Sequence, residues 1–351
     1  MTTFAAARLT DFAEGLLAAI GLARDESRVV AACLVEANLR GIDSHGVLRL
    51  IQYASAIERN EVNPRPQIRV DRSHPSAALV DAGGGYGFRP AQVAMDLAVE
   101  LATASGVGLV GVRNSHHFGM AANFAERASS AGLIGIVTTN TGPVMAPAGV
   151  TTPLVGNNPL AIAVPRRQPA PPLVLDMALS GTAFGRIRLA AAEGRPIPIG
   201  WAHDREGRPT TDAAEALAAS LLAPIGGHKG YVLSVMLEVL TGILTGSRFG
   251  LNADAHSHLE GGAAHLLIAV RPDLFVDREQ FLESVEALVA QLRSAPTGEG
   301  VEVLLPGEVE QRTREQRAAA GVPLSDNLAG QLDELAARLG FAGRLLAPAG
   351  Q

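Results

Sequence analysis

Three side chains suited to acid/base and carboxylate chemistry follow one another at helical spacing near the N-terminus. His45, Arg49 and Tyr53 are four residues apart, and the apolar positions between them recur with a helical rather than a strand period. The spacing predicts a helix over residues 44–59 with the three side chains on one face. An imidazole exchanges protons, a guanidinium grips a carboxylate at two points, and a phenol donates a hydrogen bond. Together they suit acid/base chemistry on a small carboxylic acid.

The start of this helix bears on the state of the histidine. Asp43 or Ser44 is placed to cap the helix, which puts His45 in its first turn. The positive end of the helix dipole disfavours imidazolium, so we expect a neutral, tunable ring. The competing interpretation is that the stripe is only the solvated face of an amphipathic helix, and this stretch alone favours that interpretation.

Length and composition indicate a globular protein of two domains, or of one domain with another inserted. The chain has 351 residues, 47% of them hydrophobic and 38 of them glycine. A net charge of -6 without a basic run predicts no nucleic-acid partner. The lone Cys33 excludes a disulfide framework and agrees with a reducing, cytoplasmic setting.

Nothing in the sequence predicts a targeting or membrane segment. The N-terminus lacks a basic stretch followed by an apolar core, so we expect no signal peptide. The interval between Arg127 and Arg166 holds no charged side chain, but its many glycines, prolines and asparagines fit buried strand and loop rather than a membrane helix.

Periodicity predicts an α/β chain that opens with three helices, over residues 3–20, 25–40 (capped by Asp25) and 44–59. Strands are expected at 77–81, 107–112, 135–139, 160–164, 173–177 and 265–270. Further helices are expected at 90–104, 120–130, 231–245 and 278–294. A final amphipathic helix at 324–339 is placed to pack against the N-terminal helices.

A glycine-rich turn after the first strand looks like a dinucleotide-binding fingerprint but fails in detail. Gly85-Tyr86-Gly87 would need a third glycine where Pro90 stands, and Arg113 rather than an acidic residue follows the next strand. We therefore interpret the turn as structural.

Two other stretches combine polar side chains with glycine at the start of a helix. Asn114 to Gly119 follows a strand, and because adjacent side chains on extended backbone alternate, we expect His117 rather than His116 to face a site. Residues 224–230 could cradle a phosphate with successive glycine amides and Lys229, or could equally be a glycine-rich connector.

Histidines near residue 256 raise the question of a metal. Asp254, His256 and His258 precede His265, but no helical His-Glu pair or cysteine supports a ligand set, so polar loop histidines are favoured and no metal is predicted. A metal hydrolase built on these residues, and a non-catalytic carboxylate or nucleotide binder, are the competing functional classes.

Five motifs, in order and spacing, resemble those of the type-2 malate/L-lactate dehydrogenase family. They are Asp43-Ser44-His45-Gly46 with Arg49 and Tyr53, Asn114-Ser115 with His117-Phe118-Gly119, Gly156 with Asn158-Pro159-Leu160-Ala161, Leu175-Asp176-Met177-Ala178, and Gly227-His228-Lys229-Gly230-Tyr231. The resemblance extends from about residue 11 to residue 324. The family includes L-sulfolactate and ureidoglycolate dehydrogenases, diketogulonate reductase and piperideine/pyrroline-2-carboxylate reductases.

The resemblance implies an α/β fold whose NAD(P)-binding domain is not a Rossmann fold but a large mixed sheet, joined to a helical domain formed by the N- and C-terminal segments. It places a helical part at residues 1–70, the NAD(P)-binding domain at 71–305 and a returning C-terminal segment at 306–351. Such proteins transfer a hydride between NADH or NADPH and a small 2-oxo acid, usually as homodimers whose sites lie between domains.

The resemblance also implies roles for individual residues. His45 would donate a proton to the developing alkoxide with support from Ser44, and Arg49 would bind the substrate carboxylate. Tyr53, His117 and Asp176 would complete the substrate site. The implied cofactor-binding residues are His117, Phe118, Gly119, Met120, Ala121, Asn157, His228, Lys229, Gly307 and Glu308.

Two positions depart from the family pattern. Asn157 stands where many relatives have threonine, so an amide replaces a hydroxyl. Imino-acid reductases place an aspartate after the position of Gly185 to support the Ser-His pair, whereas this chain has Arg186, which favours a 2-hydroxy-acid dehydrogenase over a cyclic imino-acid reductase. A ureidoglycolate-type dehydrogenase is a further alternative. The added cation at Arg186 favours a dianionic substrate such as oxaloacetate.

Overall fold

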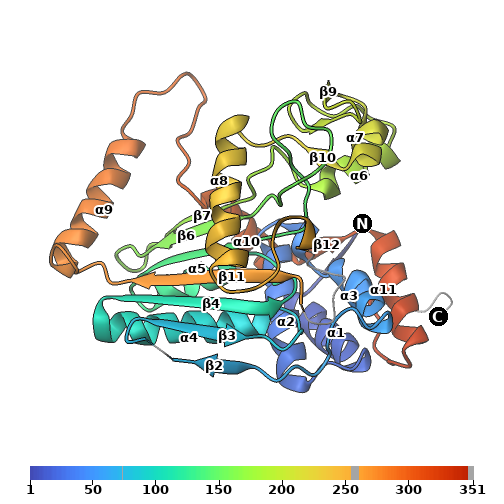
Figure 1. Cartoon of the computed structure of the whole chain (residues 1–351), viewed down its shortest axis with the longest axis horizontal. Coiled ribbons are helices and arrows are strands. Elements are labelled where there is room, and N and C mark those ends of the chain that lie inside the picture. Colours follow the sequence, from blue (N-terminus) through green and yellow to red (C-terminus); the bar gives the residue numbers. More distant parts are fainter. Residues whose placement is uncertain (73, 254–260, 347–351) are drawn as a thin grey trace.

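The computed structural model describes residues 1–72, 74–253 and 261–346, and a seven-stranded sheet forms its centre (Figure 1). The strand order is β2-β3-β4-β11-β5-β6-β7. Across the described residues of this sheet, β3 and β4 run parallel and the other neighbours antiparallel, so the predicted mixed sheet is confirmed. The strands span Arg69–Asp71 (β2), Ala77–Asp81 (β3), Val107–Ser115 (β4), Ile134–Thr139 (β5), Leu160–Val164 (β6), Leu173–Met177 (β7) and Ala263–Val270 (β11).

Helices cover both faces of the sheet. On one face, α4 (Phe88–Ser105) and α5 (Ala122–Ser130) approach closely because a Cβ at Gly108 or Gly135 would clash with a helix carbonyl. On the other face, α8 (His228–Glu238) continues through a π-helical turn, Val239–Ile243, and Gly111 of β4 faces Thr245 just beyond it.

The described N-terminal and C-terminal helices lie side by side at one flank of the sheet (Figure 1). β1 (Thr2–Phe4) pairs with β12 (Val322–Leu324), and α11 (Asp326–Arg338) packs against α3 (Arg49–Glu58). The other helices of this flank are α1 (Ala6–Ala19), α2 (Arg24–Leu39) and α10 (Glu308–Ala320). The apolar faces of α1, α2, α3 and α11 share one buried core with the sheet, whereas α10 has no buried residue.

Two predicted helix starts are wrong. The helix predicted from residue 3 begins at Ala6, because residues 2–4 are drawn into the strand pair with β12. Asp25 does not cap the second helix: Ala23 is its N-cap residue, and the Asp25 carboxylate accepts a hydrogen bond from the neighbouring Glu26 amide inside the first turn.

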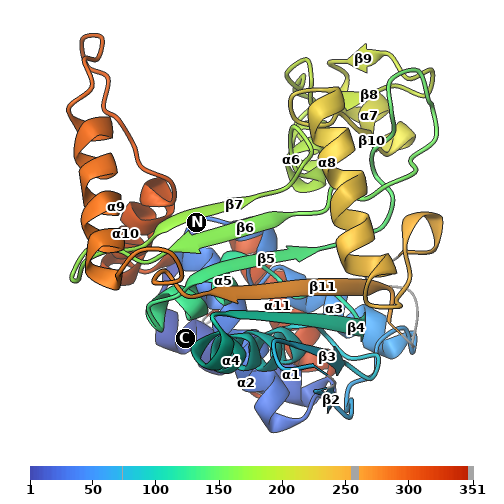
Figure 2. The same ribbon diagram turned by 60° about the vertical axis from the view of Figure 1, so that its left-hand side comes forward.

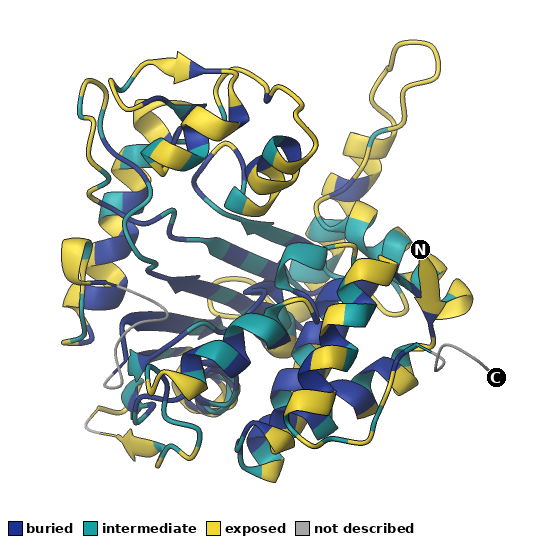
Figure 3. Cartoon of the chain, turned by 90° about the vertical axis from the view of Figure 1, so that its right-hand side faces the viewer, coloured by how far each residue is buried: buried dark blue, intermediate teal, exposed yellow. Residues whose placement is uncertain are grey.

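Residues 142–237 contribute to a second, smaller buried cluster that includes Met145, Leu179, Ile187 and Leu222. It lies among α6 (Phe184–Ala192), α7 (Ala213–Ala219) and a small sheet of β8 (Ala202–His203), β9 (Pro209–Thr210) and β10 (Leu221–Leu222). The sequence predicts no elements between residues 178 and 230, since these are too short to show a period. In Figure 3 the central strands of the main sheet are largely buried, whereas the edge strand β2 and much of the smaller unit are exposed.

The remaining elements lie toward the outside. α9 (Arg278–Arg293) stands off one end of the main sheet and is held to the β6–β7 connection by the Arg166–Glu286 ion pair (Figure 2). A short 3-10 helix, Gly250–Asn252, follows α8. In the described parts of the chain, every helix is too short or too polar to cross a membrane.

Candidate active site

The predicted helix over residues 44–59 is broken. Asp43–His45 forms a 3-10 turn, Gly46 is extended, and α3 begins only at Arg49. The reason is tertiary: the Asn38 amide accepts a hydrogen bond from the Val47 N–H at 2.8 Å, and a Cβ at Gly46 would overlap that side chain. His45 therefore precedes the helix and does not lie in its first turn.

Neither predicted cap is used. Asp43 instead accepts hydrogen bonds from Asn38 and from Arg317 of α10, at 2.6 and 2.8 Å. These contacts tie the turn that carries Ser44 and His45 to two helices. The turn is thus held by side chains that lie far apart in the sequence.

A serine–histidine pair and a tyrosine–histidine pair meet at this turn. Ser44 Oγ lies 2.9 Å from His45 Nδ1, and Tyr53 Oη lies 2.7 Å from His117 Nδ1. The rings of His45 and His117 stack with centroids 5.5 Å apart. The structure thus brings together four of the residues that the sequence singles out, and His117 comes from the loop after β4, as predicted.

Arg49 lies beside these pairs with part of its guanidinium still available. Its Nε donates to the Ser44 carbonyl and its Nη1 to Gln52 Oε1, both at 2.7 Å. Its Nη2 donates to no group among the described residues. A fixed cation with an open edge can bind one carboxylate.

Burial sets the protonation state of His45. Desolvation, and after it the charge of Arg49, lowers the His45 pKa from 6.5 to about 4. The ring is therefore neutral at pH 7, as the sequence predicts, but the predicted cause is wrong because His45 is not in the first turn of a helix.

The hydrogen bonds of His117 define its tautomer. Burial raises the pKa of Tyr53 well above its ordinary value, so the phenol stays protonated. Nδ1 also accepts the Gly119 N–H at 3.3 Å, and a nitrogen that accepts a backbone donor carries no proton of its own. The neutral ring of His117 therefore carries its proton on Nε2.

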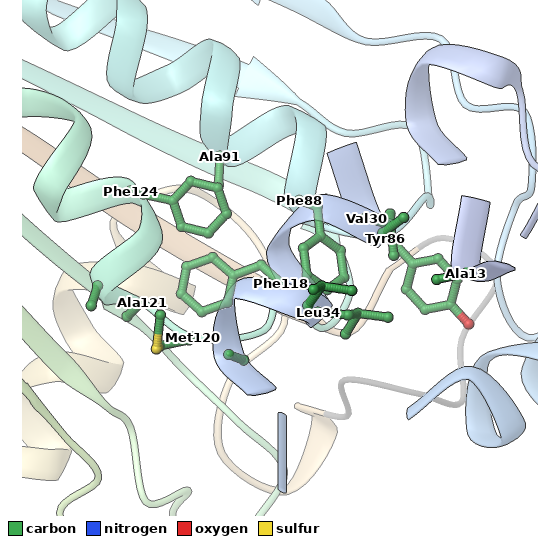
Figure 4. Close-up of a cluster of buried hydrophobic side chains, with 14 of the residues drawn as sticks. Ala13, Val30, Leu34, Tyr86, Phe88, Ala91, Phe118, Met120, Ala121 and Phe124 are labelled. Carbon is green, nitrogen blue, oxygen red and sulfur yellow. The ribbon is translucent and has the colours of Figure 1, made fainter. Parts of the chain in front are cut away.

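The loop that follows His117 is anchored by its side chains. Phe118 and Met120 point into the apolar cluster of Phe88, Phe124 and neighbouring residues (Figure 4). Phe118 also stacks on the buried ring of His265 at 4.4 Å. The side chains of these two predicted cofactor-binding residues are thus part of the core, and only their backbone is placed to meet a ligand.

His265 has a structural environment rather than a metal-ligating one. Its Nε2 lies 2.8 Å from Ser115 Oγ, and its Nδ1 lies 2.7 Å from Thr139 Oγ1. The described residues contain no cluster of three potential metal ligands. Asp254, His256 and His258 fall outside the described residues.

The other predicted cofactor-binding segments are neighbours of β7 and its continuation to residue 180. Gly307 packs on Val174, where Val174 N–H donates to the Pro306 carbonyl at 3.0 Å. Farther along, the Asp176 carboxylate accepts the Ala122 N–H at 2.8 Å. These contacts bring the start of α10 and the start of α5 to one strand.

The same line continues past the strand. Asn157 donates to Ser180 Oγ at 3.2 Å, and Ile225 N–H donates to the Leu179 carbonyl at 2.8 Å. The loop before His228 therefore also lies beside the backbone that continues from β7. One extended backbone segment is the common neighbour of four predicted cofactor-binding segments.

Asp176 holds the start of α5 and makes no hydrogen bond to the histidine cluster. Burial is the first cause that raises its pKa, to about 6, and the Ala122 amide and the Arg40 charge oppose it. Arg40 itself forms an ion pair with Glu126. Asp176 was predicted to bind substrate. In the structure it lies on β7, beside the segments that were predicted to bind the cofactor.

Two cavities open along this line. One of about 360 Å³ is lined by residues that include Gly226, Gly227 and His228. The other, of about 170 Å³, is lined by residues that include Gly307 and Glu308. Lys229 and Asn157 line neither cavity, and Glu308 is held by Arg293 and Arg312.

One cation at the site, Arg188, is not predicted from the sequence. Gly185 of α6 lies against Ser44, and the charge of Arg188 on the same helix helps burial to lower the Arg49 pKa. Arg186, which was predicted to act here, is not among the charges that perturb Arg49 or His45. The three-residue spacing of Gly185 and Arg188 does indicate that both lie on one side of a helix. The sequence does not show that this side faces Ser44, so Arg188 could not be assigned to the site.

A family model described as malate/L-lactate dehydrogenase matches residues 4–333. The chain belongs to this family. The predicted family and the enzyme class of a dehydrogenase are thereby confirmed.

Individual relatives cover most of the chain. A malate dehydrogenase of Pyrococcus horikoshii is 36% identical, over 96% of this chain and 95% of its own. A (2R)-3-sulfolactate dehydrogenase (NADP(+)) of Chromohalobacter salexigens is 40% identical, over 86% of this chain and 88% of its own. The solved structure of sulfolactate dehydrogenase from Methanocaldococcus jannaschii superposes with a TM-score of 0.89 at 34% identity, covering 97% of this chain and 98% of that one.

Proposed function

We propose that the protein is an NAD(P)-dependent 2-hydroxy-acid dehydrogenase that interconverts a small 2-oxo acid and its 2-hydroxy acid. The observation that carries the proposal is the cluster in which Ser44 and His45 meet Tyr53 and His117 beside the open edge of Arg49. The cluster combines a proton-exchanging group with a carboxylate-binding group, which are the two functions that this substrate class requires.

Arg49 and His117 orient the substrate. The free edge of Arg49 binds the carboxylate, and the Nε2 proton of His117 is a further donor to substrate oxygen. Because Arg49 is held by the Ser44 carbonyl and Gln52, its orientation is fixed before substrate arrives. Such preorganisation reduces the entropy lost on binding.

His45 exchanges the proton at the substrate oxygen. Neutral His45 can accept the hydroxyl proton of a 2-hydroxy acid, and a substrate carboxylate that offsets the charge of Arg49 raises the His45 pKa toward the value needed for donation. Ser44 remains hydrogen-bonded in both states, because a hydroxyl can donate to a neutral Nδ1 and accept from a protonated one.

The residues along β7 suit a nicotinamide dinucleotide. When bound, such a cofactor supplies or accepts the hydride at the substrate carbon. Gly226 and Gly227 have positive φ and open space where a Cβ would stand, so their backbone can approach a phosphate. The rest of the cofactor site would be lined by Asn157, His228, Lys229, Gly307 and Glu308. The backbone of residues 117–121 would lie near the nicotinamide end.

We also retain the finer predictions for the fold and its setting. The sheet has one parallel pair among its described strands, which supports a cofactor domain without the Rossmann arrangement. Helices from both chain ends form the flank at α3, which supports a helical domain of residues 1–70 and 306–351 beside a cofactor domain of 71–305. A cytoplasmic location and no nucleic-acid partner follow from the cysteine content and charge.

An apolar stripe along α8 and the π-helical turn that follows it supports a homodimer. Five residues at helical spacing are each exposed by between 40% and 52%: Val232, Met236, Val239, Leu240 and Ile243. A contiguous apolar stripe on the surface is typical of a protein interface. Light scattering should give twice the chain mass, and Met236→Lys should shift it toward the mass of one chain.

The cyclic imino-acid reductase is the less supported alternative. Gly185 of α6 lies against Ser44, and no carboxylate among the described residues bonds to the Ser44–His45 pair. A ureidoglycolate-type dehydrogenase requires the same proton exchange and stays within the proposal as a substrate choice.

Loss of NADH or NADPH absorbance tests the proposal directly. Purified protein is mixed with oxaloacetate, pyruvate, a branched 2-oxo acid, or a cyclic imino acid, and His45→Ala is the control. Turnover of a 2-oxo acid that disappears in the control is expected. Turnover of the imino acid alone would replace the proposal by its alternative, and undiminished turnover in the control would remove His45 from the mechanism.

A further inference from the structure

We infer that Arg188 determines substrate choice by binding a second anionic group, so that the preferred substrate is a 2-oxo acid with a carboxylate or sulfonate beyond the oxo carbon. The inference rests on the proposed function and deepens it. It is carried by the way α6 lies against the Ser44–His45 turn.

The orientation of α6 follows from three of its residues. Ile187 and Ala190 are buried in the smaller apolar cluster, and Gly185 lies against Ser44, where a built Cβ would be 3.8 Å from the serine Cβ. At about 100° per residue, Gly185 lies roughly opposite the buried pair on the helix. The face centred on Gly185 therefore looks toward the catalytic turn.

Arg188 belongs to that face and Arg186 does not. Arg188 is about 60° from Gly185 around the helix, whereas Arg186 is about 100° away on the other side. The charge of Arg188 is also felt by Arg49. Both arginines are exposed on the same short helix, so they differ chiefly in the direction in which they project.

The charge balance favours an anion between the two guanidinium groups. Arg188 forms no ion pair or hydrogen bond with the described residues, and Arg49 keeps its Nη2 unpaired. Two like charges near each other repel, and this repulsion is relieved when a ligand brings a negative charge to each. A monoanion such as pyruvate satisfies Arg49 alone, whereas a dianion satisfies both.

The test compares Arg188→Gln with Arg186→Gln, which removes the same charge from the same helix. For wild type and both variants, kcat and KM are measured with oxaloacetate, sulfopyruvate and pyruvate. We expect Arg188→Gln to lower kcat/KM for the dianions by about 10- to 100-fold, mainly through KM, the effect of one charged hydrogen bond. Pyruvate turnover, and all activities of Arg186→Gln, should change less than about 3-fold.

The relative loss with the two dianions distinguishes a carboxylate from a sulfonate as the preferred group. An oxaloacetate to pyruvate ratio that is unchanged by Arg188→Gln would overturn the inference while leaving the dehydrogenase intact. An equal loss in Arg186→Gln would also overturn it, because general surface charge would then explain the effect.

Calorimetry keeps the inference testable if no substrate turns over and the proposed function fails. L-malate and L-lactate are titrated into each protein without cofactor. Weaker malate binding in Arg188→Gln alone, with thermal melting unchanged, supports the anion site. Equal malate affinity in all three proteins overturns it.

Discussion

Replacing His45 with asparagine should flatten the dependence of folding stability on pH between pH 7 and pH 4.5. Burial and the charge of Arg49 lower the His45 pKa from 6.5 to about 4, so in this interval the unfolded chain binds a proton that the folded chain does not. The contribution of His45 to stability is therefore fully present above pH 6.5 and is lost as the pH falls toward 4.

The magnitude follows from the two pKa values. A single group that titrates at 6.5 when unfolded and about 4 when folded changes the free energy of unfolding by about 2 kcal/mol between pH 7 and 4.5. This is an upper value, because the His45 ring keeps some contact with solvent. A change of this size is well within the resolution of urea unfolding curves.

The assay is urea unfolding of wild type and His45→Asn at both pH values. Other groups that titrate in this interval, such as Asp176, are present in both proteins and cancel in the difference. Wild type should lose about 2 kcal/mol more than the variant on acidification. Parallel losses in the two proteins would refute the low pKa and, with it, the argument that burial keeps the imidazole neutral.

Three further changes probe the site and its support. Tyr53→Phe removes a donor to His117 Nδ1 and should lower kcat/KM for a 2-oxo acid by about 10-fold, measured by steady-state kinetics, with little effect if the tautomer of His117 is irrelevant. Gly46→Ala forces a Cβ against Asn38 and should reduce stability by about 1–3 kcal/mol in urea unfolding, whereas an unchanged midpoint would show that Asn38 moves freely. Glu238→Gln places an NH₂ group among the donors of Asn140, Asn158 and the Gly250 amide and should cost about 1–3 kcal/mol by thermal melting; an unaltered Tm would contradict the role of Glu238 as their shared acceptor.

Local pattern found six strands of the main sheet but missed β1, β2, β12 and the small sheet of β8, β9 and β10, and it was also weak for the ends of helices. The bounds expected for β3, β6 and β7 are those found, because buried strands are short apolar runs limited by glycine, proline and polar residues. The order of the strands in the sheet could not be predicted from the sequence. β11 lies between β4 and β5, although it is far from both in the sequence. The pairing of strands that are distant in the sequence depends on how their side chains pack together. The hydrophobic period of a single strand does not show which strand it will pair with.

The clearest error concerns the helix expected to begin at residue 44. Its apolar period is real and α3 carries it, but the turn before Arg49 is set by the hydrogen bond that Val47 N–H donates to Asn38 and by those that Asp43 accepts from Asn38 and Arg317. Propensity is a weak influence when a buried amide offers a competing hydrogen bond. The same tertiary contacts moved His45 out of the helix dipole and made burial the cause of its low pKa.

The sequence by itself determined which chemistry is available: it places Ser44, His45, Arg49 and Tyr53 within ten residues of one another. Only the tertiary structure decided what completes the site. His117 arrives from the end of a strand and Arg188 from a helix of the smaller unit, and neither position follows from local spacing. The physical reason is that short-range periodicity is fixed by backbone geometry, whereas contacts between distant segments are fixed by packing and hydrogen bonding in the whole core.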